Sequence, residues 1–353
     1  MLTQQGRIPV VPETSDHSKT MYFQTLNPHE SPAEAAAWTA AALHTSQADP
    51  FCCLPSWQLA FHDAFIPNRR LFIAEEGGAV LAFAEQFVPP DHIYLTPLES
   101  SWFFGCPLMG KGAVALFAKA LSFWAEAYQT SFPTILISGI QPGGSLGRNL
   151  FTAFNGDFTF YLHSDGVQCS ASLTGGVDGY LSRRSANHRS KLKKAAKKAH
   201  AAGIAFERHI PASVEEARMV YARMIAVEKT SWKGLGHCGM AEPVISDFYA
   251  FLLERQVPFQ SSRIIFALHE GKDIGFIFGG MAGDIYRGQQ FSYTHDWRAY
   301  SIGNLMQTEQ ILWLCEEKAR RYDMGPIADP RMEYKSHWTE IEIPIHTWVL
   351  QKK

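Results

Sequence analysis

Two stretches of the chain decide the fold: RLFIAEEGGAVLAF at 70–83 and RIIFALHEGKDIGF at 263–276. They align without a gap, and each consists of two apolar runs around a turn that contains glycine, which is the signature of a β-hairpin. The identical pairs are Arg70 and Arg263, Ala74 and Ala267, Gly78 and Gly271, and Phe83 and Phe276. This internal repeat predicts that the chain contains one folding unit twice.

The segments after each hairpin repeat in the same order. In the first half, the patterns predict a strand at 101–105, a helix at 112–128 and a strand at 134–138. In the second half, they predict a strand at 288–294 and a helix at 304–322. Strands and helices mixed in this way predict an α/β protein with mixed sheets.

Domain boundaries follow from turn-rich segments. The segment at 165–180 is rich in glycine, serine and aspartate, which favours a connection between domains. We therefore expect a flexible N-terminal lead-in at 1–30, a first domain at 31–170 and a second domain at 171–353. Two domains agree with a length of 353 residues.

Composition excludes several classes of protein. Hydrophobic residues make up 46% of the chain and charged residues 19%, which is typical of a globular protein. The net charge of −2 is not that of a protein that is basic overall. We find neither a signal-peptide pattern nor an apolar run long enough for a membrane helix, so we expect a cytoplasmic protein without a membrane partner. The histidines show no close ligand spacing, which predicts no metal site, and the six cysteines are expected to be mostly buried thiols.

A basic run lies at 181–203 and contains no acidic residue. Its cations are Arg183, Arg184, Arg189, Lys191, Lys193, Lys194, Lys197 and Lys198. Small apolar residues at helical spacing predict an amphipathic helix with one cationic face. Such a face attracts phosphates of a cofactor, a tRNA or a nucleotide-linked substrate, or it is simply a solvated surface.

Three further segments carry candidate site residues. In YTHDWRAYSIGNLMQ at 293–307, Ser301-Ile302-Gly303 stands where a helix begins, so its N–H groups favour an anion, and Arg298 precedes it. The loop EKTSWKG at 228–234 places Trp232 beside Lys233, a pairing found both in pockets and in loops pinned to a core. The segment at 322–338 brings Asp323, Tyr334 and Lys335 in or next to expected strands.

Together these motifs resemble the Fem-like proteins of the GNAT superfamily, of the cellulose-biosynthesis-associated acetyltransferase type. The resemblance covers roughly residues 50–345. The motifs occur in the family's order: Pro55-Ser56-Trp57, the basic helix with Arg189, E-x-x-SWKG at 228–234, SIGNLM at 301–306, YDMG at 322–325 and YK-x-x-W at 334–338.

The resemblance implies two tandem GNAT-like domains, each a twisted mixed sheet flanked by helices, and acyl transfer to an amine. It places the pyrophosphate of the acyl donor at Arg298, Ser301, Ile302, Gly303 and Asn304. Ser301 stands where related loops have glycine. The family pattern also implies substrate binding by Trp232, Lys233, Tyr334 and Arg189.

Acylation of an amine requires removal of a proton from the ammonium and protonation of the leaving group. We expect Asp323 to be the base, with Asp296 as the next candidate, and Tyr293 or Tyr300 to protonate the departing group. Lys335 would orient Asp323 or bind an anionic group of the acceptor. Positioning of the two substrates would supply most of the catalysis, so no covalent nucleophile is required. We expect no permanently bound cofactor, with acyl-coenzyme A as cosubstrate.

Three functions remain open at this point. The first is an N-acyltransferase that uses an acyl-coenzyme A and acts on a small amine, an amino acid or a peptide. The second is a Fem-type transferase that uses aminoacyl-tRNA; the basic helix favours it, while the near-neutral charge and the lack of a long coiled-coil arm disfavour it. The third is a binding protein on a degenerate acyltransferase fold, to which Ser301 points.

Overall fold

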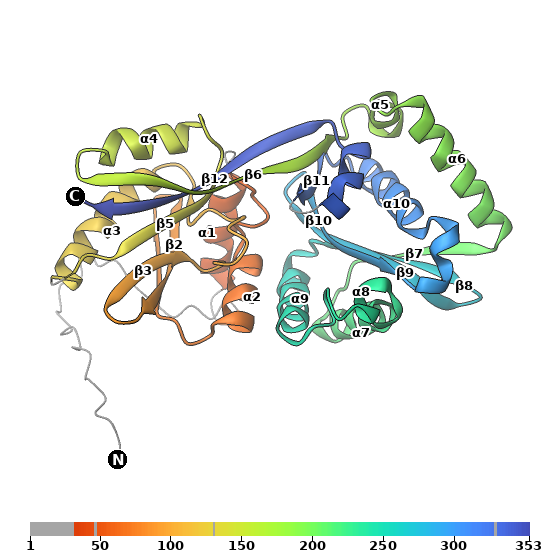
Figure 1. The fold of residues 1–353 in the computed structure, drawn as a ribbon, viewed down its shortest axis with the longest axis horizontal. Helices are drawn as coiled ribbons and strands as arrows, with labels where there is room; N and C mark the ends of the chain where they lie inside the picture. Colours follow the sequence, from red (N-terminus) through yellow and green to blue (C-terminus); the bar gives the residue numbers. More distant parts are fainter. Residues whose placement is uncertain (1–31, 46–47, 130, 328–329) are drawn as a thin grey trace, which may run out of the picture.

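A computed structural model describes residues 32–45, 48–129, 131–327 and 330–353. The expected lead-in at 1–30 lies outside the described residues. A single twisted sheet runs through the described part of the molecule, in the strand order β1-β2-β3-β5-β12-β6-β11-β10-β9-β8-β7, with β4 paired to β2 (Figure 1).

The first half contains the first hairpin and its surroundings. Its elements are α1 (Pro32–Leu43), α2 (Pro55–Phe65), β1 (Leu71–Glu76), β2 (Ala79–Val88), β3 (His92–Pro97), β4 (Leu108–Met109), α3 (Ala113–Ala127), β5 (Thr134–Ile140), α4 (Ser145–Phe154) and β6 (Phe158–Ser172). The expected hairpin is confirmed, because β1 and β2 pair antiparallel across Gly77 and Gly78.

The second half repeats this order after a helical connection. Its elements are α5 (Gly176–Ser182), α6 (Ala186–Ala201), β7 (Ile204–His209), α7 (Val214–Thr230), α8 (Trp232–Leu235), α9 (Pro243–Gln256), η1 (Val257–Phe259), β8 (Ser262–His269), β9 (Lys272–Ala282), β10 (Ile285–Tyr293), η2 (His295–Tyr300), α10 (Ile302–Glu316), β11 (Arg321–Pro326), η3 (Pro330–His337) and β12 (Ile341–Lys352). Helices α5, α6 and α10 lie along one side of this half of the sheet, and α7, α8 and α9 along the other (Figure 1).

The two halves share their longest strands. The last strand of the chain, β12, leaves the second half and inserts between β5 and β6 of the first. In turn, β6 pairs antiparallel with β11 of the second half. Strands β6 and β12 form one long antiparallel ribbon between the halves (Figure 1). The tandem architecture of mixed sheets flanked by helices is confirmed, and the numerical boundary between the domains remains a prediction, because it falls inside β6.

Aromatic packing joins the halves below this ribbon. Helix α2 packs against α9, and Phe248 of α9 contacts the rings of Trp57 and Phe61, with centroid distances of 4.9 and 6.2 Å. All three side chains are buried. Large aromatic rings in edge-on contact contribute both buried area and favourable geometry to such an interface.

Two expected elements are wrong. The segment 101–105 is a loop, because the buried carboxylate of Glu99 accepts hydrogen bonds from the N–H groups of Ser101, Trp102, Phe103 and Phe104 and wraps the backbone around itself. The long helix expected at 304–322 ends at Glu316. Lys318 adopts a left-handed φ of 61°, and the N–H of Ala319 returns to the carbonyl of Leu314, which closes the helix end. Tyr322 therefore belongs to β11 instead of the helix.

Candidate active site

An opening between two parallel strands creates the site. Strand β10 pairs with β11 only through Ile285, Tyr286 and Arg287. From Gly288 onward β10 diverges from β11, and its pairing with β9 is interrupted between Gly288 and Gln290, so Gln289 is an extra residue in the strand. A bulge of this kind bends a strand and redirects its side chains.

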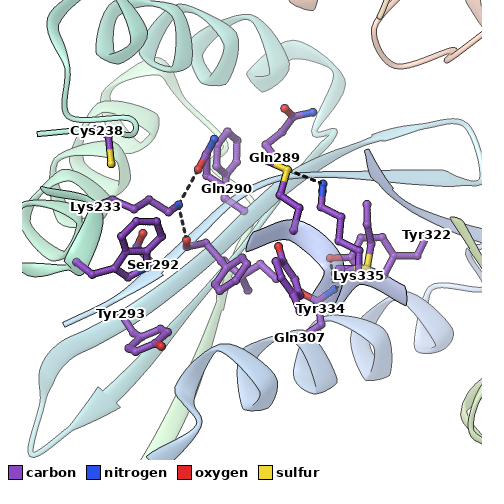
Figure 2. A pocket seen from close by; sticks show the side chains of 17 residues that line it. Lys233, Cys238, Gln289, Gln290, Ser292, Tyr293, Gln307, Tyr322, Tyr334 and Lys335 are labelled. Atoms are coloured by element: carbon purple, nitrogen blue, oxygen red, sulfur yellow. Dashed lines mark hydrogen bonds between the residues drawn. The ribbon is translucent and has the colours of Figure 1, made fainter. Parts of the chain in front are cut away.

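A cavity of about 320 Å³ lies at this opening. Its lining residues come from α8 and the loop after it, β9, β10, α10, β11 and η3 (Figure 2). They are Trp232, Lys233, Cys238, Ile277, Phe278, Gly288, Gln289, Gln290, Phe291, Ser292, Tyr293, Gln307, Tyr322, Met324, Met332, Tyr334 and Lys335. No carboxylate stands among these described lining residues.

Lys335 is the most deeply buried cation of the lining, with 8% of its surface exposed. Its Nζ donates a hydrogen bond to the carbonyl of Pro326 at 2.6 Å. Burial, reinforced by the nearby positive charge of Arg287, lowers the pKa of Lys335 to about 8. A substantial fraction of this amine is therefore neutral at mildly alkaline pH.

Lys233 enters the cavity from the opposite side (Figure 2). Its Nζ donates to the Oε1 of Gln290 at 2.9 Å and to the carbonyl of Phe291 at 2.8 Å. Burial lowers the pKa of Lys233, and the negative charge of Glu228 partly offsets this effect. The two bonds tie the α8 segment to the edge of β10.

Two buried polar groups of β10 have no hydrogen-bond partner among the described residues. Ser292 is 3% exposed, and its Oγ finds no hydrogen-bond partner among the described residues. The Nε2 of Gln289 also has no hydrogen-bond partner among the residues that the structure describes. Because an unpaired buried polar group costs about 1–3 kcal/mol, a ligand that bonds to these groups would gain affinity from them.

The start of α10 adjoins this cavity. A Cβ placed on Gly303 would lie 2.9 Å from the Cε2 of Phe291 and 3.5 Å from the Cε1 of Tyr293, both of which line the cavity. The Ser301 side chain makes no capping hydrogen bond, so the first N–H groups of the helix remain available to an anion. Small size at Gly303 thus keeps the helix start close to the cavity wall.

Ser301 has the left-handed conformation that glycine prefers, with φ 56° and ψ 38°. An L-residue pays roughly 1–2 kcal/mol there. We expect Ser301→Gly to be at least as stable as the unmodified protein, and Ser301→Val to be less stable in urea unfolding, because a branched Cβ tolerates the left-handed region less well than serine does. A Ser301→Val variant as stable as the unmodified protein would contradict this backbone conformation.

The sequence-predicted residues divide into three groups. Trp232, Lys233, Tyr293, Tyr334 and Lys335 line the cavity. Arg298, Ser301, Ile302, Gly303 and Asn304 lie at or just before the start of α10. Asp323, Asp296, Tyr300 and Arg189 do not line the cavity.

Asp323 faces away from the cavity. Tyr322 and Met324 line it, and the alternation of the strand turns Asp323 to the other side of the sheet. There its fully buried carboxylate accepts from the Ser170 Oγ at 2.6 Å and pairs with Arg321 at 2.9 Å. Burial raises the pKa of Asp323. These contacts give Asp323 a structural role, and its assignment as the base is corrected.

The other three residues also lie elsewhere. Asp296 is exposed in η2. Tyr300 carries the Nζ of Lys198 above its ring at 4.4 Å, and Arg189 donates to the carbonyl of Leu181 at 3.2 Å. Their roles as base, acid and substrate ligand therefore have no support from the cavity.

Sequence reasoning missed several residues of the lining, among them Gln289, Ser292 and Gln307. Gln307 lies on α10, and its Nε2 donates to the hydroxyl of Tyr322 at 2.5 Å. A signal existed for the bulge, since two consecutive glutamines interrupt the strand pattern in RGQQFSY. The described residues contain no cluster of three or more His, Cys, Asp or Glu suited to a metal ion, and no described helix is long and apolar enough to cross a membrane.

In the first half, the corresponding opening is filled. Strands β3 and β5 pair in parallel only through Tyr94 and Leu95. Beyond them the loop of Glu99 closes in: the Ser138 Oγ donates to the carbonyl of Gly105 at 2.5 Å, and a Cβ on Gly139 would lie 2.6 Å from the Phe104 carbonyl oxygen. The asymmetry leaves the second half with the open cleft.

The site therefore lies where two parallel central strands diverge over a cavity, beside a helix start without a side-chain cap. Residues 186–336 match a family model described as an acetyltransferase (GNAT) domain. This match lies in the second half of the chain, and the fold of the chain as a whole is similar to that of FemX. The cellulose-associated subtype stays a prediction.

Solved structures share the whole fold. FemX has 11% identity to this chain and a TM-score of 0.63, with 88% of this chain and 95% of that chain covered. A conserved protein of unknown function from Bacteroides thetaiotaomicron has 12% identity and a TM-score of 0.62, covering 95% and 100%. L-PGS from Bacillus licheniformis has 14% identity and a TM-score of 0.53, covering 86% and 92%. No curated protein sequence matches the chain.

Proposed function

We propose that the protein transfers an acyl group from an acyl-coenzyme A thioester to an amine, at the cavity of the second half. The observation that carries this proposal is the divergence of β10 from β11 at Gly288. It frees the edge of β10 for the amide groups of a pantetheine arm. At the far end of that edge, the N–H groups at the start of α10 favour the donor's phosphates.

The reaction forms one bond and breaks another. The amine nitrogen attacks the thioester carbonyl carbon, the C–N bond forms, and the C–S bond breaks with its electron pair on sulfur. The amine loses one proton and the thiolate gains one. Lys335 is our candidate for the base, because its Nζ lies at the cavity and burial lowers its pKa to about 8. Tyr293, at the end nearer α10, is the candidate that protonates the thiolate.

Donor binding is tested by thermal unfolding with acetyl-coenzyme A. At about 100 times its dissociation constant the ligand should stabilise the fold by about 2.7 kcal/mol. We expect Arg298→Ala and Gly303→Val to reduce this gain, since the valine would push on the Phe291 ring beside the helix start. Gly156→Val is the matched control, because no atom lies within 4 Å of its Cβ position. Equal melting temperatures with and without acetyl-, longer acyl- and free coenzyme A would contradict the proposal.

An aminoacyl-tRNA donor is the second candidate. Helix α6 exposes Lys191, Lys193, Lys194, Lys197 and Lys198. The Nζ of Lys198 donates to the carbonyl of Ala299 at 2.8 Å, which joins this cationic face to the segment before α10. If tRNA is the donor carrier, its affinity must fall steeply with salt, by about 0.7–0.9 log units per log unit for every neutralised phosphate. Filter binding of charged tRNA at two salt concentrations measures this slope.

Ser301 favours a working donor loop over the non-catalytic alternative. The non-catalytic alternative rests on serine replacing a glycine in this loop. Here Ser301 itself adopts the glycine-like conformation, so the course of the backbone into α10 is preserved. A pure binding role would leave the acyl donor unconsumed in the presence of a broad panel of amines.

A further inference from the structure

Large apolar side chains stand exposed on α8 and η3, two segments that contribute to the cavity lining. Trp232 is 47% exposed and Leu235 is 63% exposed, both on the four-residue helix α8. Met332, on η3, is 36% exposed. Trp232 and Met332 belong to the cavity lining. An exposed tryptophan at the edge of a concave site is typical of a surface that is covered by a ligand.

The position of Trp232 is fixed by its neighbours. The Oγ of Ser231, which is fully buried, accepts hydrogen bonds from the N–H groups of Lys233 and Gly234 at 3.1 and 3.3 Å. Gly234 packs so closely that a Cβ would lie 2.3 Å from the carbonyl oxygen of Glu228. The bonds from Lys233 to β10 hold the segment from the other side. The backbone that carries the Trp232 side chain is thus held in place beside the cavity.

Apolar surface continues from α8 and η3 into the cavity. Phe278, Phe291 and Met324 form the inner wall, and apolar and aromatic side chains make up most of the lining. Acetyl transfer to a small polar amine would leave much of this surface uncovered. Burying apolar area is favourable in proportion to the area removed from water.

We infer that the substrate held between Trp232 and Met332 carries an extended apolar group, longer than an acetyl group. This inference rests on the proposed function, because it names the chemical class of the substrate at that same site. The apolar group belongs either to the transferred acyl chain or to the acceptor amine. In both cases the cavity binds an apolar chain. Affinity would depend on chain length for acyl-coenzyme A esters in the first case and for amines in the second.

Calorimetry with two ligand series tests the inference. The first series is acetyl-, butanoyl-, hexanoyl- and octanoyl-coenzyme A, without acceptor. The second is the straight-chain amines of the same lengths, without donor. We expect affinity to rise about fourfold for each added CH₂ in one series, which is about 0.8 kcal/mol per CH₂ converted to a ratio of constants. Trp232→Ser and Met332→Ser should flatten that rise. Phe151→Ser, at a side chain that is 56% exposed on α4, should leave it unchanged.

The possible results of the two series distinguish a failure of the apolar-group inference from a failure of the proposed function. If acetyl-coenzyme A binds and neither series depends on chain length, the inference is overturned while the proposed function stands. If no thioester binds, the proposed function fails, and the amine series still decides whether the cavity takes an apolar group. A length dependence that survives in both Trp232→Ser and Met332→Ser would place the apolar group elsewhere and overturn the inference.

Discussion

Asp49→Ala should destabilise the protein by about 3–5 kcal/mol, because it leaves the buried guanidinium of Arg287 without its charge partner. The side chains of Asp49 and Arg287 are 1% and 5% exposed, and Nε and Oδ2 are 2.8 Å apart. The carboxylate also accepts hydrogen bonds from the Nε2 of Gln168 and the N–H of Phe51. An isolated buried charge is far more costly than a hydrogen-bonded pair.

The matched control is Asp284→Ala. Asp284 forms an ion pair with Arg320 at 3.1 Å, but the two side chains are 53% and 68% exposed. Exposed pairs contribute at most about 1 kcal/mol, so this variant should unfold at nearly the same urea concentration as the unmodified protein. Asp49→Leu combined with Arg287→Met should recover much of the loss. Equal effects of Asp49→Ala and Asp284→Ala would contradict the account of the pair.

The ion pair of Asp49 and Arg287 also links the first half of the chain to the cavity of the second half. Asp49 belongs to the first half, and the Nη1 of Arg287 donates to the carbonyl of Gly288 at 2.9 Å, where β10 leaves β11. A Cβ on Gly325 of β11 would lie 2.5 Å from that same Nη1. One guanidinium thus contacts both diverging strands. The first half, whose own opening is filled, therefore helps to fix the geometry of the cavity.

Lys335→Met should lower kcat/KM by about 10²–10⁴-fold, the usual contribution of a general base. Donor binding should be nearly unchanged, because the phosphates are expected at α10. The rate of the unmodified enzyme should rise with pH and level off above about 8, since the neutral amine is the base and its fraction grows as pH passes the pKa of about 8. Lys335→Arg should lose a similar factor in kcat/KM, because a guanidinium stays protonated.

A stability measurement separates catalysis from a structural role for Lys335. Its pKa is lower in the folded protein than the ordinary 10.5, so the unfolded chain binds more protons between pH 8 and 10.5. The charged form therefore costs stability below pH 8, and this cost is relieved as pH rises towards 10.5. Lys335→Met should be at least as stable as the unmodified protein at pH 7. A variant that unfolds more easily at pH 7, or a rate independent of pH from 6 to 9, would refute this role.

The hairpin repeat predicted the tandem fold because its cause is local. Alternating apolar residues around a glycine turn specify β1–β2 and β8–β9 without reference to the rest of the chain. The insertion of β12 between β5 and β6 of the first half has no local sequence pattern that predicts it. It depends on pairing with β6, a strand far away in the sequence.

The site was predicted only in part for a related reason. Trp232 and Lys335, which the motif loops marked as candidate site residues, both line the cavity, and their roles stay predictions. Asp323 was misassigned because a shift of one residue along a strand reverses the face, and the sequence does not say which face meets the cavity. The contact of Asp49 with Arg287 joins residues 238 positions apart, and no local pattern marks such a contact.

Hydrogen–deuterium exchange with saturating acetyl-coenzyme A tests the central claim most directly, because it locates the donor without requiring the acceptor. We predict slower exchange in two segments, the edge of β10 at 288–293 and the start of α10 at 302–305, with little change along β3 and β5. Protection confined to the first half, or none in either segment while the ligand is bound, would contradict the placement of the acyl-transfer site between β10 and β11.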